Sequence, residues 1–257
     1  MQKVNELSEQ TAIITGAGQG IGLAVAHHLA RLGMNLVLCA RGAEKLHALS
    51  DQIKKQRPET QVMVLPCDVR DHLQVEQVVV DTLERFGRID VLINNAGVAP
   101  KVGLLQEMSI DDIDRTIDTN LKGVIYFMRA VLPAMVHQQQ EQPQGSKLPS
   151  STIININSVA GKTAYPFWSV YDASKFGLTA ITEAVAEEQR TNNIKVVGIY
   201  PGAVDTPIWH GIDPDHEPSH KGMLDAETIA EAVVYILQQP QKVFITDLTL
   251  SPLKPVL

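Results

Sequence analysis

The segment YDASK, residues 171–175, places a tyrosine four positions before a lysine. Side chains at this spacing lie on one face of a helix, one turn apart. A free phenol has a pKa of about 10, and a nearby ammonium favours the phenolate, so such a pair can donate and accept a proton. The same spacing also occurs by chance on helix surfaces. The chemistry of Tyr171 and Lys175 therefore depends on what the rest of the chain places beside them.

A glycine-rich segment, TGAGQGIG at residues 15–22, joins the first apolar run to a helical pattern. Gly16 permits a tight turn, Gly20 lets the backbone approach a pyrophosphate, and Gly22 allows close packing of helix on strand. The following helix offers free N–H groups and the positive end of its dipole to phosphate. The spacing is not G-x-G-x-x-G, but its place between strand and helix favours a nucleotide cradle over an unliganded turn.

The end of the second strand indicates which dinucleotide is bound. An NAD site has a carboxylate there, about 20 residues after the glycines, that binds the ribose 2′-hydroxyl. Ala40 occupies this position, and Arg41 follows. A guanidinium suits a 2′-phosphate through charge and forked hydrogen bonds. We therefore expect NADP(H) to be preferred over NAD(H); the alternative is an arginine that only lies on the surface loop 41–44.

Apolar runs rich in β-branched residues alternate with helical patterns along the chain. The expected strands are 11–16, 35–40, 61–66, 89–95, 152–158, 194–201 and 242–250, and the expected helices are 20–32, 43–56, 71–86, 110–137, 170–190 and 226–238. The strands are continuous apolar runs, which is typical of strands buried on both faces. The alternation predicts an α/β fold: a single-domain, Rossmann-type, doubly wound parallel sheet of about seven strands with helices on both faces.

No linker divides the chain, so residues 1–257 are expected to form one dinucleotide-binding domain. The segment HQQQEQPQGSKLPSS, residues 137–151, is polar and interrupted by proline and glycine. It is expected to be an exposed loop insertion after a helix that ends near Met135.

Composition excludes several classes of protein. There is no run of about 18 apolar residues, and the polar segment 1–10 lacks the apolar region of a secretory signal, so we expect no membrane association. The net charge of −7, without a cluster of lysines and arginines, argues against nucleic acid. Cys39 and Cys67 are expected to be buried, reduced thiols, which indicates a cytoplasmic location. The histidines, including His210, His216 and His220, show no metal-site pattern, so no metal is expected.

Six motifs occur in a fixed order: TGAGQGIG, NNAG at 94–97, Asn120 in a helix, Ser158 after a strand, YDASK, and PGAVDT at 201–206. In this order the chain resembles the short-chain dehydrogenase/reductase superfamily over nearly its whole length. Twelve residues separate Ser158 from Tyr171, as is common in that family. The stretch from Asn120 to Ser158 is longer than usual, and the polar segment 137–151 accounts for the excess.

The resemblance implies a catalytic set of four residues. Tyr171 would be the general acid in carbonyl reduction and the general base in alcohol oxidation. Lys175 would bind the nicotinamide ribose and, together with an oxidised nicotinamide, lower the Tyr171 pKa toward the working range. Ser158 would hydrogen-bond the substrate oxygen, and Asn120 would hold a water that links Lys175 to solvent.

The resemblance also implies cofactor contacts. Asp68 would hydrogen-bond the adenine amino group with Val69 beside it. Three residues of NNAG would line the adenosine ribose, namely Asn94, Ala96 and Gly97. Four residues of PGAVDT would hold the carboxamide and pyrophosphate, namely Pro201, Gly202, Val204 and Thr206. A turn cap at NNAG and a simple strand exit at PGAV are the alternatives. The implied cofactor-binding residues are Gly16, Gly18, Gln19, Gly20, Ile21, Gly22, Arg41, Asp68, Val69, Asn94, Ala96, Gly97, Tyr171, Lys175, Pro201, Gly202, Val204 and Thr206.

Substrate contacts in the family come from the loop after PGAVDT, here 207–224, and from residues after Ser158. The first loop carries Ile208 and Trp209, and the segment 161–168 carries three further aromatic residues. Aromatic side chains here favour an apolar or aromatic carbonyl over a sugar, although packing on the fold would also recruit them.

The resemblance implies an NADP(H)-dependent oxidoreductase of the carbonyl reductase or alcohol dehydrogenase branch, acting on a small-molecule carbonyl or alcohol. A 3-oxoacyl-[acyl-carrier-protein] reductase is the alternative; it is disfavoured because the C-terminal segment 243–257 is not glycine-rich and no basic patch stands out for an acidic carrier. A non-catalytic NADP(H)-binding redox sensor is a third reading, but such proteins usually lose the tyrosine or lysine. The family also implies a homodimer or homotetramer, formed through helices near 110–137 and 170–190.

Overall fold

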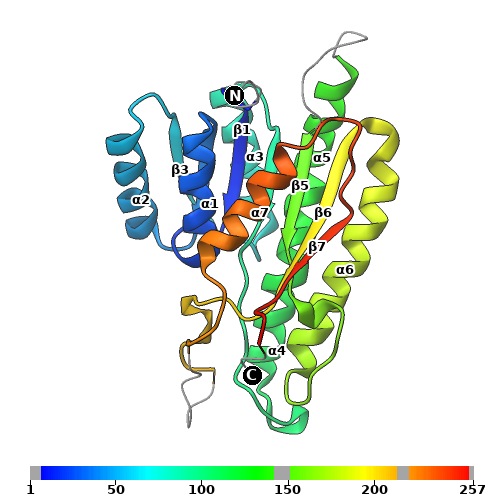
Figure 1. Ribbon diagram of the computed structural model, residues 1–257. Helices are drawn as coiled ribbons and strands as arrows, with labels where there is room; N and C mark the ends of the chain where they lie inside the picture. Colours follow the sequence, from blue (N-terminus) through cyan, green and yellow to red (C-terminus); the bar gives the residue numbers. More distant parts are fainter. Residues whose placement is uncertain (1–6, 142–150, 213–219, 255–257) are drawn as a thin grey trace.

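A computed structural model describes residues 7–141, 151–212 and 220–254 (Figure 1). Its strands are β1 (Thr11–Thr15), β2 (Asn35–Ala40), β3 (Val62–Pro66), β4 (Val91–Asn94), β5 (Ser151–Ile156), β6 (Ile194–Pro201) and β7 (Asp247–Leu250). They form one seven-stranded sheet in the order β3-β2-β1-β4-β5-β6-β7, and every neighbouring pair is parallel. The predicted Rossmann-type sheet is confirmed.

Helices cover both faces of this sheet. They are α1 (Gly20–Arg31), α2 (Ala43–Gln56), α3 (His72–Phe86), α4 (Ile110–Ile117), α5 (Gly123–Gln140), α6 (Ser169–Gln189) and α7 (Ala226–Leu237). One hydrophobic cluster joins α1, α2 and α7 to the sheet, and a second joins α3, α5 and α6 to its other face. Neighbouring residues of one strand serve opposite clusters: Ile14 packs in the first and Ile13 in the second. This explains why the strands read as continuous apolar runs.

Three expected boundaries are wrong. The single helix expected over 110–137 is α4 and α5 joined by a π-helical turn, Asp118–Lys122, in which the Gly123 N–H bonds the Asp118 carbonyl. α5 continues to Gln140 instead of ending near Met135, so the expected loop 137–151 begins later; its residues 142–150 lie outside the described part of the chain. The last strand spans Asp247–Leu250, not 242–250. Phe244 and Ile245 still bury their side chains against the core, which accounts for the apolar run without a strand ladder.

The sheet has a topological switch between β1 and β4. From β1 the chain moves outward through β2 and β3, then returns to pair β4 with the other side of β1. In open α/β sheets ligands bind at this point, beyond the carboxyl ends of the strands. The turns after β1, β4, β5 and β6 all open onto this edge, at the lower end in Figure 1.

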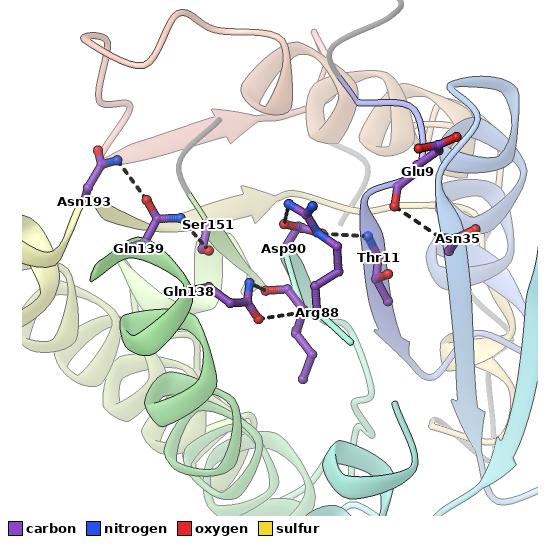
Figure 2. Close-up of polar contacts among 10 residues, drawn as sticks. Glu9, Thr11, Asn35, Arg88, Asp90, Gln138, Gln139, Ser151 and Asn193 are labelled. Atoms are coloured by element: carbon purple, nitrogen blue, oxygen red, sulfur yellow. Dashed lines mark hydrogen bonds and ion pairs between the residues drawn. The ribbon is translucent and has the colours of Figure 1, made fainter. Parts of the chain in front are cut away.

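A polar clamp at the opposite, amino-terminal edge holds the starts of three strands together (Figure 2). The Asp90 carboxylate accepts hydrogen bonds from the Thr11 backbone N–H at 2.8 Å and from the Arg88 guanidinium at 2.7 and 2.8 Å. The backbone of Asp90 bonds Thr11 on β1 and Thr152 on β5. Asp90 is 5% exposed, so its charge relies on these donors.

Two other expectations concern membrane-spanning helices and the state of the two cysteines. Among the described residues, no helix is both long and apolar enough to cross a membrane. Cys39 and Cys67 are both free thiols and both buried, as expected. Burial raises the pKa of Cys67 to about 12 and that of Cys39 well above its usual value, so both remain protonated at neutral pH.

We predict that Asp90→Ala lowers the free energy of unfolding by about 1–3 kcal/mol, because the Thr11 N–H loses its buried acceptor. Urea denaturation followed by circular dichroism measures the change. Asp51→Ala, at an exposed carboxylate on α2, is the matched control and should change the value by less than about 0.5 kcal/mol. Equal effects of the two substitutions would contradict the clamp.

Candidate active site

The glycine turn after β1 is shaped by close backbone contacts. Gly16 and Gly20 have positive φ angles of 63° and 55°, which side chains disfavour. A Cβ on Gly22 would lie 2.4 Å from the Gly16 carbonyl oxygen, and one on Gly16 would lie 2.9 Å from the Ala96 backbone. The turn therefore packs too closely on the end of β4 to carry side chains, and it lies at the amino end of α1, where N–H groups can bind a pyrophosphate.

Asn95 fixes this turn to the end of β4. Its side-chain amide donates to the carbonyl oxygens of Thr15 and Gly16 at 2.9 and 3.2 Å. The Thr15 hydroxyl in turn accepts from the backbone N–H groups of Asn95 and Ala96. The turn cap considered for this segment is thus present at Asn95, and it supports the cradle rather than replacing it.

The structure brings together the predicted cofactor segments. A Cβ on Gly20 would lie 3.2 Å from the Thr206 methyl group, so the glycine turn meets the PGAVDT segment. The Gly202 N–H bonds the Leu250 carbonyl oxygen at 2.7 Å, which anchors the same segment to β7. A Cβ on Gly97 would lie 3.5 Å from the Asn120 side-chain oxygen. The segments that follow β1, β4 and β6 thus converge at one edge of the sheet.

The residues at the end of β3 are more constrained than the sequence indicated. Both Asp68 oxygens accept hydrogen bonds from the Arg70 guanidinium, and the ion pair holds the Asp68 pKa below its usual value. Val69 is buried, with its side chain against Gly123. At the end of β4, Asn94 is also buried; its amide donates to Asn155, and its side-chain oxygen has no hydrogen-bond partner among the described residues. The adenosine contacts expected here stay predictions.

Lys45 is a cation at the cradle that sequence reasoning missed. Its Nζ donates to the Gln19 side-chain oxygen at 2.8 Å, and its Cβ lies 3.4 Å from where a Gly18 Cβ would be. Arg41 is exposed just before α2, and its charge lowers the pKa of Asp68. The sequence signal that could have indicated Lys45 was its place in the first turn of α2, four residues after Arg41.

Ser158 and Tyr171 meet at the carboxyl end of β5. Ser158 caps the short helical turn Val159–Gly161, where its hydroxyl accepts from the Ala160 N–H at 3.1 Å. A hydrogen bond with Ser158 favours the Tyr171 phenolate. Burial outweighs that bond and raises the pKa of Tyr171 to about 12, with the Asp172 charge adding to the rise. Tyr171 is therefore a phenol at neutral pH.

Lys175 lies one turn along α6 and is buried, whereas Tyr171 is partly exposed. Lys175 is 6% exposed, its Nζ lies 3.3 Å from the Ile156 carbonyl oxygen, and it stands 5.7 Å from the centre of the Tyr171 ring. Burial lowers the pKa of Lys175 to about 8. The expected lowering of the Tyr171 pKa toward the working range is absent in the protein alone, because burial disfavours both charged forms and dominates.

Asn120 sits in the π-helical turn and links two other parts of the site. Its side-chain oxygen accepts from the Val98 N–H, and its amide donates to the Val98 carbonyl, both at 2.8 Å. The amide also donates to the Ser174 hydroxyl at 3.2 Å. Asn120 is 1% exposed. It therefore joins the loop after β4 to the helix that carries Tyr171 and Lys175.

Asn157 is a second residue that sequence reasoning missed. Its amide donates to the Lys175 carbonyl oxygen at 3.2 Å and to the Thr179 hydroxyl at 3.0 Å. A Cβ on Gly161 would lie 2.8 Å from the same Lys175 carbonyl, so the turn after Ser158 packs directly on α6. Asn157 thereby sets the position of α6 relative to Ser158. The only sequence signal was a polar residue at the end of an apolar run.

Comparison with known proteins agrees with this geometry. Residues 10–217 match the family model described as short chain dehydrogenase. An uncharacterised oxidoreductase of Staphylococcus aureus (strain MW2) is 34% identical over 248 residues, covering 96% of this chain and 98% of that protein. The chain therefore belongs to the short-chain dehydrogenase family and is an oxidoreductase.

Solved structures show the same fold at similar identity. A metagenomic short-chain oxidoreductase in complex with NADP is 31% identical, with a TM-score of 0.81 and coverage of 98% of this chain and 100% of that one. A 3-ketoacyl-(acyl-carrier-protein) reductase from Brucella melitensis complexed with NADH is 25% identical, with a TM-score of 0.82 and coverage of 96% and 98%. The two structures hold different nicotinamide cofactors.

We predict that kcat/KM for the reduced nicotinamide cofactor falls as the pH rises through about 8. Because the Lys175 pKa is depressed, its ammonium loses the proton in this range, and its attraction for the anionic cofactor is lost. Tyr171, with a pKa raised to about 12, stays protonated and does not limit the rate. Initial rates at saturating substrate measure the profile.

Lys175→Arg is the control for this profile, because its guanidinium stays charged throughout the range. The variant should be slower but should not show the decline. A wild-type profile that stays flat to about pH 10, where free lysine and tyrosine begin to titrate, would contradict the role of Lys175.

Proposed function

We propose that the protein is an NADP(H)-dependent oxidoreductase that interconverts a small-molecule carbonyl and its alcohol. The observation that carries this proposal is the placement of Tyr171, hydrogen-bonded to Ser158 and one turn from a buried Lys175, at the edge that holds the glycine cradle. The cradle fits a dinucleotide, because Gly16 and Gly20 have the positive φ angles of a tight turn and the Gln19 side chain does not cap the amino end of α1, where N–H groups can bind phosphate. The nicotinamide would supply the hydride that the chain's own side chains cannot.

The protein side chains would handle the proton and the substrate oxygen. Tyr171 donates its proton to the oxygen that becomes an alkoxide in carbonyl reduction, and Ser158 hydrogen-bonds the same oxygen. A phenol that is protonated at neutral pH suits this direction. Lys175 donates to the ribose of the cofactor and supplies positive charge near the reacting oxygen. A water for proton relay would use the backbone carbonyl of Asn120, because its side chain is engaged by Val98 and Ser174.

The proposed preference for NADP(H) rests on two cations beside the adenosine end of the cradle. Arg41 follows β2, and Lys45 reaches across to Gln19 in the glycine turn. Together they would surround a 2′-phosphate, which NAD lacks. The end of β2 carries Ala40, so the carboxylate that binds the ribose 2′-hydroxyl in NAD sites is missing from that position.

The wider proposal includes cytoplasmic location, suggested by the reduced thiols, and assembly as a homodimer or homotetramer through α5 and α6.

Reduction of a 3-oxoacyl group on acyl carrier protein remains the second candidate function, favoured by the likeness to the Brucella melitensis reductase. A redox sensor that binds NADP(H) without turnover is the reading from another class. Oxidation of NADPH with a panel of aldehydes and ketones separates the catalytic readings from the sensor.

We predict that Arg41→Ala and Lys45→Met each raise the Kd for NADPH about tenfold while changing the Kd for NADH less than about twofold, since each removes a charge-assisted bond to the 2′-phosphate. Nucleotide fluorescence titrations measure both constants. Lys54→Met, at an exposed lysine on the same helix, is the matched control and should leave both unchanged. Equal use of NADPH and NADH by the unmutated protein would refute the assignment.

We predict that Tyr171→Phe lowers kcat by more than about a hundredfold and leaves the Kd for NADPH nearly unchanged, because it removes only the proton donor. Steady-state rates with an accepted ketone, together with the same cofactor titration, test this expectation. Wild-type turnover by the variant would exclude Tyr171 as the general acid.

A further inference from the structure

Two tryptophans from different loops meet beside Tyr171. Trp168 directly precedes α6, and its ring lies 5.5 Å from the Tyr171 ring at an angle of 67°. Trp209 ends the short helical turn Pro207–Trp209, and its ring lies 6.2 Å from that of Trp168 at 79°. Both contacts are edge-to-face, the arrangement that aromatic pairs favour. The three rings form a continuous aromatic row that begins at the proton donor.

The polar atom of Trp209 is already engaged. Its indole N–H donates to the Val204 carbonyl oxygen at 2.7 Å, within the segment proposed to hold the cofactor. This bond fixes the orientation of the Trp209 ring and occupies its N–H donor. Both tryptophans are partly buried, so each keeps some surface open. Trp209 therefore presents its ring carbons, not its N–H group, to whatever binds at Tyr171.

Backbone bonds hold the surrounding loops in place. The Val102 N–H donates to the Ile212 carbonyl at 2.9 Å, which ties the loop of Trp209 to the segment after β4. The Gly103 N–H donates to the Phe167 carbonyl at 3.2 Å, which ties the loop of Trp168 to that segment. Phe167 has a φ of 71°, an unfavourable value for a bulky residue, so its loop is held in one conformation against local strain. Residues 213–219 of the expected substrate loop lie outside the described chain.

The carboxylates near this row disfavour an anionic substrate. Asp172, only 4% exposed, lies on the helix turn of Tyr171, and its carboxylate accepts from the Tyr165 N–H at 2.7 Å. Asp205 pairs with His220 in the segment that leads to Trp209. In the described ranges, the rings with a cation over them are Phe86, Tyr171, Tyr200 and Phe244, so neither indole carries one.

We propose that Trp168 and Trp209 form a substrate wall that selects uncharged ketones whose carbonyl is attached to a flat ring. The inference rests on the proposed function, because the carbonyl must reach Tyr171 and Ser158 for its ring to lie against the indoles. A flat ring can stack on an indole, whereas a flexible chain must lose rotational freedom to make the same contact. An acyl thioester on an acidic carrier protein fits neither the surface nor the nearby carboxylates.

Intrinsic fluorescence tests the wall without turnover, because these are the two tryptophans of the chain. The experiment titrates the full-length protein, saturated with NADP+, with acetophenone, with 2-octanone, which has the same number of carbon atoms, and with the anion benzoylformate. The wall predicts saturable quenching or a saturable spectral shift with acetophenone at a concentration at least about tenfold below any effect of the other two. Purely linear quenching by acetophenone, or tighter binding of either competitor, would overturn the proposal.

Kinetics with NADPH give the second readout. Wild-type kcat/KM should be at least about tenfold higher for acetophenone than for 2-octanone. The substitution Trp209→Leu should raise the KM for acetophenone about tenfold and change the KM for 2-octanone by less than about twofold. Tyr235→Leu, at an exposed aromatic residue on α7, is the control. Equal losses for both ketones in Trp209→Leu would refute selection by the wall.

The two failures are distinguishable. Saturable binding of acetophenone, without oxidation of NADPH by any carbonyl, would contradict the proposed function but support the substrate wall. Turnover of 2-octanone or of an acyl-carrier thioester in preference to acetophenone would support the proposed function but contradict the substrate wall.

Discussion

The burial of the Lys175 ammonium against the end of β5 is the constraint on which the site depends. A buried charge is costly unless polar groups compensate it, and here the Ile156 carbonyl lies 3.3 Å away while the pKa falls to about 8. The Lys175 carbonyl oxygen accepts from the amide of Asn157, the residue after Ile156, and the missing side chain of Gly161 lets the turn after β5 touch α6. The strand end, the turn after it and α6 therefore form one unit. Tyr171 reaches Ser158 because these contacts place α6 beside the turn after β5.

Burial also makes the pKa values of Tyr171 and Lys175 in the protein alone differ from those expected from the YDASK motif. A lysine one turn from a tyrosine should stabilise the phenolate if charge were the dominant effect. In the folded protein both groups lose solvent, so the pKa of Tyr171 rises while that of Lys175 falls. The site as folded favours a neutral phenol, which is the form that donates a proton.

Sequence reasoning predicted the elements well because hydrophobic pattern is local information. Ile13 and Ile14 serve opposite cores, so the run that contains them reads as a strand buried on both faces. The π-helical turn around Asn120 was missed because a single inserted residue hardly changes helical periodicity. The contacts of Lys45 with Gln19 and of Trp168 with Trp209 were missed for a different reason. They join segments far apart in the chain, and spacing carries no information about which segments meet.

Ultraviolet difference spectroscopy tests most directly whether burial keeps Tyr171 a phenol in the cofactor-free protein. The chain has five tyrosines, so the phenolate absorption of Tyr171→Phe is subtracted from that of the wild type across the pH range. Since the Tyr171 pKa is raised to about 12, no difference band should develop below about pH 10, the ordinary range of tyrosine. A phenolate band that the substitution removes, with its midpoint between about pH 7 and 9, would show that Lys175 outweighs burial and would contradict this account.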